Sequence, residues 1–207
     1  LTVAQRVLYA FGERFGDVPV RLFRAPGRVN LRGMHVDTHG GFLNLMTHQR
    51  EVLLAAAPTG TKESVLANVN PAFTEVPFDF EDECRGIKYD RIWWEGIADP
   101  SVSGRPQKRS AAPATAWSNY CIGAVLRIAY GHRQPYLGGL NIMVDSDLPR
   151  GAALSSSAAL IVASLLAYER CNALESSTAQ LIQATQDVEW YAGARVGMGD
   201  QTAILDR

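Results

Sequence analysis

The chain has 207 residues, of which 47% are hydrophobic and 20% are charged, as is ordinary for a globular protein. Its formal net charge of −1 gives no electrostatic reason to expect nucleic acid or an anionic membrane as a partner. No apolar stretch approaches the roughly 20 residues that a membrane-spanning helix needs. The N-terminus also lacks the basic region and long apolar run of a signal peptide.

The cysteines point to a reducing compartment. Cys84, Cys121 and Cys171 are odd in number, lie far apart and form no C-x-x-C pair. Neither a disulfide framework nor a structural zinc site is therefore expected. Free thiols are typical of the cytoplasm, which is the location that we expect.

The first third of the chain predicts one helix followed by strands. Apolar residues recur at helical spacing over residues 3–15, which indicates an amphipathic helix that ends at Gly16. Alternation over residues 20–27 predicts a strand that is stopped by Pro26-Gly27. Further strands are predicted over residues 42–58 (one or two strands), 64–70 and 73–80.

The rest of the chain predicts mainly helices. Residues 99–115, DPSVSGRPQKRSAAPAT, are interpreted as a polar loop broken by prolines. Alternation of Leu140, Ile142 and Val144 predicts a strand. Helices are expected from Trp117 to Gly131, over residues 155–173 and over residues 177–194, the last one capped by Ser177 or Thr178. The mixture predicts an α+β fold with a mainly antiparallel sheet backed by helices.

The first stretch whose residues suit ligand binding is DLPRGAALSSSAALIVASLLA, residues 147–167. Small residues let a backbone approach a ligand closely, and the free N–H groups at a helix start favour anions. Serine hydroxyls add donors for phosphate oxygens, and one hydroxyl is able to ligate Mg²⁺. The stretch is not a Walker A loop, because no G-K-[ST] follows. The alternative is that the serines only cap a buried helix.

Two more stretches carry charged residues between glycines. In residues 25–42, Arg28 and Asp37 suit either a buried ion pair or the recognition of a polyol and a phosphate. In residues 193–206, Asp200 stands in a glycine-rich turn, where a surface turn is the alternative. Glu189 lies on the preceding predicted helix, where simple solvation is the alternative. The four histidines show no metal-ligand spacing.

Together and in this order, the three stretches resemble the GHMP kinase superfamily and its galactokinase branch. Galactokinases carry a pattern close to G-R-V-N-L-I-G-E-H-T-D-Y-N-G-G, which stands here as G-R-V-N-L-R-G-M-H-V-D-T-H-G-G. Their phosphate loop is similar to P-L-G-A-G-L-S-S-S-A-A, and here reads P-R-G-A-A-L-S-S-S-A-A. Their G-I-M-D-Q stands here as G-M-G-D-Q. W-S-N-Y, residues 117–120, also resembles a W-x-N-Y at a helix start in that family.

The resemblance implies a fold and a reaction. Residues 1–207 would form an N-terminal α+β domain of the ribosomal-S5-domain-2-like type. The family's ferredoxin-like C-terminal half is absent from this chain, which is expected to be truncated before it, and that half would complete the site. The reaction would be phosphoryl transfer from ATP to a monosaccharide hydroxyl by a sugar 1-kinase, with Mg²⁺.

The resemblance also assigns roles to residues at matching positions. Asp200 would be the catalytic base, and Arg28 would stabilise the charge of the transferred group. Met34, His35 and Asp37 fall at sugar-site positions. The triphosphate would be held by the loop made of Gly151, Ala152, Ala153, Leu154, Ser155, Ser156 and Ser157. Ser157 and Glu189 would be the Mg²⁺ ligands.

Three positions depart from the galactokinase pattern. Met34 replaces a glutamate that holds a sugar hydroxyl, so the expected substrate is a monosaccharide other than, or in addition to, galactose. Ala153 replaces a loop glycine, which is costly if the position needs a positive φ. Gly199 precedes the catalytic aspartate and is expected to loosen it. The alternatives are a sensor that binds sugar and ATP without turnover, and a half-protein with no activity of its own.

Overall fold

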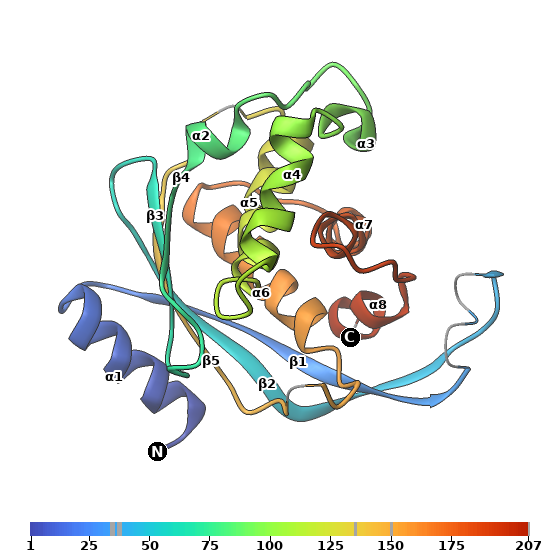
Figure 1. The fold of residues 1–207 in the computed structure, drawn as a ribbon. Helices are drawn as coiled ribbons and strands as arrows, with labels where there is room; N and C mark the ends of the chain where they lie inside the picture. The colour runs from blue at the N-terminus through green and yellow to red at the C-terminus, as the bar shows by residue number, and fades with distance from the viewer. Residues whose placement is uncertain (34–35, 37–38, 135, 150, 207) are drawn as a thin grey trace.

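A mixed sheet organises the molecule. In the computed structural model, which describes residues 1–33, 36, 39–134, 136–149 and 151–206, the sheet has five strands in the order β1-β2-β5-β3-β4 (Figure 1). Only β3 and β5 are parallel, and the other neighbours are antiparallel, as predicted. The strands are β1 Arg21–Arg32, β2 Asn44–Pro58, β3 Glu63–Asn68, β4 Val76–Asp79 and β5 Leu140–Ser146.

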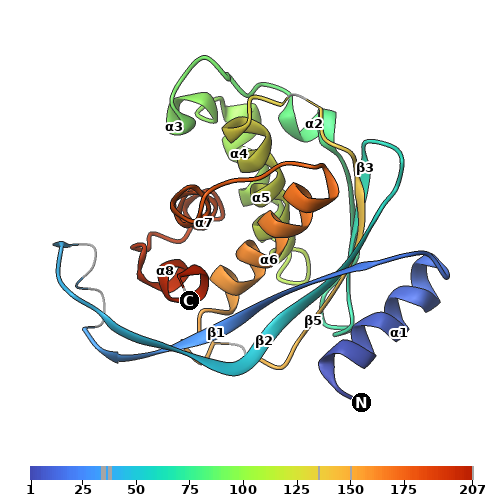
Figure 2. The ribbon, with the colours of Figure 1, turned by 180° about the vertical axis from the view of Figure 1, so that it is seen from behind.

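Helices cover both faces of this sheet. Helix α1 lies on one face, and the helical layer that contains α5 to α8 lies on the other (Figures 1 and 2). The predicted helices near both termini and in the middle are confirmed, including the caps at Gly16 and Ser177. The helices are α1 Val3–Phe15, α2 Phe80–Cys84, α3 Trp93–Gly96, α4 Pro100–Ser110, α5 Ser118–Gly131, α6 Ser156–Cys171, α7 Thr178–Tyr191 and α8 Gly199–Leu205.

The second half of strand β2, residues 52–57, is buried on both faces, which explains its apolar run. Successive side chains of a strand point to opposite faces of a sheet. Leu54 and Ala56 therefore pack into the helical layer, while Leu53 and Ala55 pack against α1. The 42–58 region thus forms one strand over Asn44–Pro58, rather than two.

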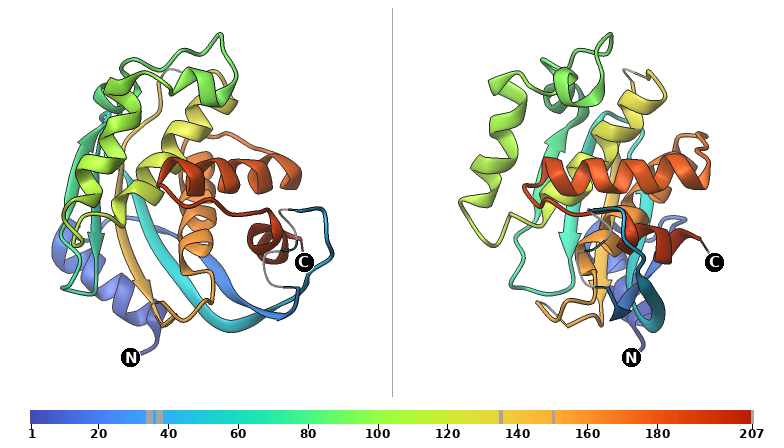
Figure 3. Two further views of the ribbon diagram at one scale, coloured as in Figure 1. Left: turned by 45° about the vertical axis from the view of Figure 1, so that its right-hand side comes forward. Right: turned by 90° about the vertical axis from the view of Figure 1, so that its right-hand side faces the viewer.

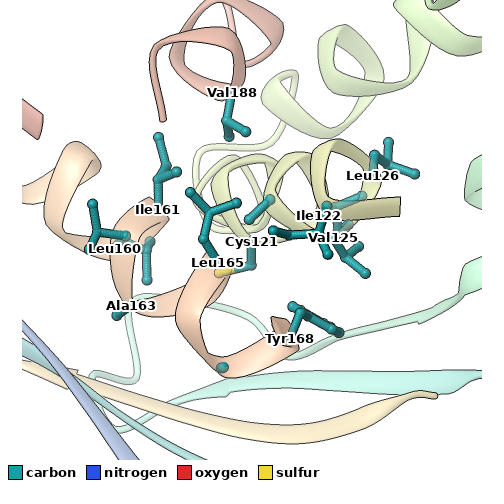
Figure 4. Close-up of a cluster of buried hydrophobic side chains, with 14 of the residues drawn as sticks. Cys121, Ile122, Val125, Leu126, Leu160, Ile161, Ala163, Leu165, Tyr168 and Val188 are labelled. Carbon is teal, nitrogen blue, oxygen red and sulfur yellow. The ribbon is translucent and has the colours of Figure 1, made fainter. Parts of the chain in front are cut away.

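The helical layer holds the larger core. Side chains of α5, α6 and α7 meet there, among them Ile122, Leu165 and Val188 (Figure 4). Gly123 lets α5 approach α7 closely, because a Cβ at this position would lie 2.8 Å from side-chain atoms of both Val188 and Tyr191. This packing fixes α7 against α5 and α6 and so fixes the residues that follow it.

The prediction that Pro26-Gly27 stops the first strand is wrong. Strand β1 continues to Arg32 with a register shift between Pro26 and Arg28. Since β1 is the edge strand, a proline without an N–H is tolerated there. A Cβ at Gly27 would lie 2.4 Å from Leu148 Cδ2 and 2.7 Å from the carbonyl oxygen of Leu154. The glycine marks a close approach of chains and does not end the strand.

The interpretation of residues 99–115 as a loop is wrong over Pro100–Ser110, which form α4, whereas residues 111–115 are turns. Asp99 caps α4 by accepting a hydrogen bond from the Ser101 N–H, and Pro100 occupies a first-turn position where no N–H is needed. Pro106 lies inside the helix but is buried, and its carbonyl accepts a hydrogen bond from Asn119 Nδ2 at 2.9 Å. Packing and this bond offset the helix-breaking effect of Pro106.

The described residues bear on the expectations for the cysteines and for membrane-spanning helices. Cys84, Cys121 and Cys171 are free thiols. In the part of the chain that the structure describes, no helix is long and apolar enough to cross a membrane.

The close approach at Gly27 predicts the effect of adding one methyl group. Gly27→Ala should lower the free energy of unfolding by about 1–3 kcal/mol, because overpacking is resisted by the backbone of Leu154. Gly12→Ala is the matched control: its Cβ would meet nothing within 4 Å inside α1, so a gain of about 1 kcal/mol is expected. Equilibrium urea unfolding measures both. A Gly27→Ala protein as stable as the parent would contradict the packing.

Candidate active site

An ion pair between β1 and α8 lies at the centre of the site. Arg28 approaches Asp200 Oδ1 with Nε at 2.7 Å and with Nη2 at 2.6 Å. The Arg28 side chain is 14% exposed and that of Asp200 is 28% exposed, so the pair is shielded from water without being closed off. Both predicted catalytic residues are therefore brought together from positions far apart in the sequence.

The phosphate loop reaches the same carboxylate. Ser155 Oγ lies 2.5 Å from Asp200 Oδ2. Since an ionised carboxylate only accepts, the hydroxyl is the donor. Both oxygens of Asp200 are thus held by charged or polar donors, and Oδ2 already accepts a hydroxyl hydrogen bond.

The loop itself has a strained backbone. Gly151, Ala153 and Ser155 have φ values of 67°, 55° and 57°, so every second residue is left-handed. The position of Ala153 does require a positive φ, which costs a residue with a Cβ about 1–2 kcal/mol. Ser155 holds this conformation at the N-cap of α6.

Arg28 also holds this loop. Its Nη1 donates to the carbonyl of Ala153 at 2.7 Å, and its backbone N–H donates to the carbonyl of Leu154 at 3.1 Å. Charge-assisted hydrogen bonds of this kind are stronger than neutral ones. One arginine therefore offsets the strain at Ala153 and ties the loop to Asp200.

Glu189 is buried, in contrast to the solvated alternative. It is 3% exposed on α7, and its carboxyl group hydrogen bonds with Ser157. Burial, with a smaller contribution from the charge of Asp200, raises the pKa of Glu189 to about 7. The two predicted metal ligands are thus neighbours.

This pair fits a hard divalent cation. A carboxylate and a hydroxyl oxygen are ligands that Mg²⁺ accepts, and Mg²⁺ commonly takes its remaining ligands from phosphates and water. Among the described residues, no three His, Cys, Asp or Glu side chains gather into a metal site of their own. An ion at Glu189 would therefore need oxygens from a ligand.

A cavity of about 410 Å³ opens next to the loop. Ser156 and Ser157 are among its polar lining residues, and Trp117 and Tyr120 of the W-S-N-Y segment are among its aromatic ones. The other apolar lining residues include Val52, Phe73, Val144, Leu148 and Leu160. The sequence motifs pointed to W-S-N-Y but not to Phe73, which comes from a different part of the chain.

The local structure at Asp200 differs from the prediction. Asp200 is in the first turn of α8, not in a turn before an apolar segment. The sugar-site positions Met34, His35 and Asp37 lie outside the described residues. The described ends of that segment belong to β1 and β2, whose pairing extends to Arg32 and Asn44.

Comparisons with known families match both halves of the chain. The family described as GHMP kinases N terminal domain matches residues 119–206, which include the phosphate loop and Asp200. The galactokinase galactose-binding signature matches residues 9–58, which include Arg28. Both matched regions contribute to the site.

Similar proteins are roughly twice as long. Galactokinase of Chloroflexus aurantiacus is 32% identical over 193 residues, which are 93% of this chain and 42% of the relative. Galacturonokinase of Arabidopsis thaliana is 31% identical over 206 residues, which are 99% of this chain and 45% of the relative. The chain thus spans less than half the length of these curated relatives.

Solved structures agree with these matches. The crystal structure of Lactococcus lactis galactokinase complexed with galactose superposes with a TM-score of 0.77 at 26% identity, and covers 98% of this chain and 46% of that one. Methanococcus jannaschii mevalonate kinase shares the fold, with a TM-score of 0.68 at 16% identity, over 91% of this chain and 52% of that one. Residues 119–206 thus carry a GHMP kinase N-terminal domain, and residues 9–58 carry the galactose-binding signature of galactokinases.

Proposed function

We propose that residues 1–207 form the N-terminal domain of an ATP-dependent sugar 1-kinase, which transfers the γ-phosphoryl group of ATP to the anomeric hydroxyl of a monosaccharide. The observation that carries this proposal is the contact of Asp200 with both Arg28 and Ser155. It joins a carboxylate, a cation and the predicted phosphate loop. A C-terminal half of the same protein is expected to complete the site.

The chemistry follows from these groups. A sugar hydroxyl is a poor nucleophile, and a carboxylate that accepts its hydrogen bond orients it or takes its proton. Asp200 Oδ2 accepts such a bond from Ser155, so a substrate hydroxyl is a chemically equivalent partner. Arg28 would neutralise charge on the phosphoryl group, and positioning with electrostatics would supply most of the rate.

ATP and Mg²⁺ are the proposed cofactors. The loop from Gly151 to Ser157 would hold the triphosphate at the N-terminus of α6, where free N–H groups favour anions. The apolar cavity beside Trp117 and Tyr120 would take the base. Ser157 and Glu189 would hold Mg²⁺, which supplies charge neutralisation to the phosphates when bound.

A second candidate substrate class is an acidic sugar. Met34 stands where galactokinases place a glutamate, and a glutamate repels a sugar carboxylate whereas a methionine does not. The relative from Arabidopsis thaliana is named a galacturonokinase and is similar over nearly the whole chain. A neutral residue at this position therefore favours a uronic acid as the alternative to galactose.

The role of Asp200 is tested by Asp200→Asn in the full-length protein. Loss of the carboxylate should lower kcat by about 10²–10⁴-fold, the usual contribution of a general base. Sugar-dependent ADP release measures the rate, and circular dichroism checks that the fold is intact. Asp206→Asn, at the exposed C-cap of the same helix, is the matched control and should keep full activity. A wild type that binds sugar and ATP without turnover would instead support a sensor.

The burial of Glu189 predicts a pH dependence of stability in metal-free buffer. Its pKa is about 7 in the folded chain and about 4.5 when exposed, so the folded state binds more protons between these values. The free energy of unfolding should therefore fall as pH rises from about 4.5 to about 7, by up to about 3 kcal/mol.

Urea unfolding with a chelator at several pH values measures this fall, and Glu189→Gln should remove most of it. Mg²⁺ competes with the proton for the carboxylate, so the same variant should raise the Mg²⁺ concentration that the kinase needs. An unchanged pH profile in Glu189→Gln would contradict the assignment.

Sugar choice is tested by Met34→Glu. If position 34 discriminates between neutral and acidic sugars, the added carboxylate should shift kcat/KM toward galactose and away from galacturonate. ADP release over a panel of monosaccharides measures the shift, and Met34→Leu is a matched control that adds no charge. The same sugar profile in all three proteins would refute a role for position 34.

A further inference from the structure

The segment between α7 and α8 places Asp200, although its sequence favours mobility. Residues 192–198 contain Gly193 and Gly197, and Gly199 directly precedes the aspartate. Glycine allows more backbone conformations than any other residue, so this composition alone predicts a loosely held carboxylate. The structure shows that the neighbouring helices hold the segment instead (Figure 3).

The first residues of the segment are closed onto the end of α7 by backbone bonds. The N–H of Gly193 donates to the carbonyl of Trp190 at 3.0 Å, and that of Ala194 donates to the carbonyl of Glu189 at 2.9 Å. These bonds define the direction in which the chain leaves α7.

The middle of the segment is held by two side chains of α7. Trp190 Nε1 donates to the carbonyl of Val196 at 2.9 Å, and Gln186 Nε2 donates to the same oxygen at 3.1 Å. A carbonyl oxygen has two lone pairs, so this one is fully used. We refer to Trp190, Gln186 and the Val196 carbonyl as the Val196 clamp.

The indole of Trp190 is itself fixed by packing. Its ring centroid lies 5.3 Å from that of Trp94 on α3, and the Cζ atom of Arg195 lies 4.7 Å from its centre. The cation over the ring adds a second tie between α7 and the segment. The Nε1–H therefore points at Val196 from a ring that is restrained by neighbouring side chains on both the segment and α3.

The end of the segment is held from α8. Gln201 Nε2 donates to the carbonyl of Gly197 at 3.0 Å, and Thr202 Oγ1 donates to that of Met198 at 2.7 Å. Gln201 is fully buried, so its amide has little freedom. Since these two residues directly follow Asp200, the ties extend to the helix turn that carries the carboxylate.

From these contacts we infer that Trp190 and Gln186 are positioning residues, which hold Asp200 against Arg28 and Ser155 through the Val196 carbonyl. The inference rests on the proposed function, in which Asp200 meets the sugar hydroxyl. A displacement of about 1 Å at such a group is enough to lower the rate by about 10²-fold. The clamp compensates for the glycines that surround Asp200 in sequence.

The test uses conservative variants of the full-length protein. Trp190→Phe keeps an aromatic ring and removes the Nε1–H, and Gln186→Leu removes the second donor. Trp94→Phe is the matched control, because a phenyl ring keeps an aromatic contact with Trp190, while the Trp94 side chain makes no hydrogen bond to residues 192–198 within the described chain. Two readouts are needed: steady-state kinetics of ADP release, and hydrogen exchange of backbone amides in the absence of substrates.

We expect kcat to fall by about tenfold in each clamp variant, the rate equivalent of one net hydrogen bond. KM for ATP should stay within about twofold, because the phosphate loop is held by Arg28 and not by the clamp. Amides of residues 193–199 should exchange faster in both clamp variants, whereas those of α6 should not. Trp94→Phe should match the wild type in kcat.

Four outcomes would overturn the inference. Faster exchange with unchanged kcat would show that mobility of the segment does not matter for the rate. A fall in kcat with an equally large rise in KM for ATP, together with faster exchange of backbone amides throughout the chain, would indicate a general structural role. A wild type with no sugar-dependent ADP release would refute the proposed function and this role with it, whereas an active wild type with an unaffected Trp190→Phe would refute the positioning role alone.

Discussion

The site depends on the contacts that the guanidinium of Arg28 makes. Nε and Nη2 bind Asp200, and Nη1 binds the carbonyl of Ala153. An edge strand, a phosphate loop and a short helix are thereby joined at one side chain. The planar fork of an arginine suits this task because its donors point in fixed and different directions, which a lysine ammonium cannot reproduce.

Several features that cost free energy lie around this contact. Ala153 and Ser155 hold left-handed backbone conformations, and Glu189 keeps a buried carboxyl group beside Ser157. Left-handed non-glycine residues also occur at Arg133 and Ala173, and Glu169 is also buried. Strain and buried charge persist in proteins where surrounding contacts impose them, and such places are commonly functional. The predicted phosphate loop combines two strained residues with a buried carboxyl group beside it, which agrees with a loop built for a ligand.

The sequence predicted elements well where local patterns and packing agree, and failed where tertiary contacts decide. Alternation of apolar and polar residues predicted β5, and helical periodicity with capping residues predicted α1 and α7. Pro26-Gly27 looked like a stop because the pattern does not reveal an edge strand or a neighbour that excludes a side chain. Residues 100–110 looked like a loop because prolines break helices locally, while the contact of Pro106 with Asn119 lies outside any local window.

For the site, the sequence by itself indicated the family, through three ordered motifs, and through them Arg28, Asp200, Ser157 and Glu189 as candidate site residues. A motif specifies residue types and spacing, since these are properties of the chain. Only the tertiary structure decided that Arg28, Ser155 and Asp200 touch, that Glu189 is buried, and that Trp190 holds the segment before Asp200. Such contacts join residues that are distant along the chain or lie on different elements, and packing of the whole fold sets their distances.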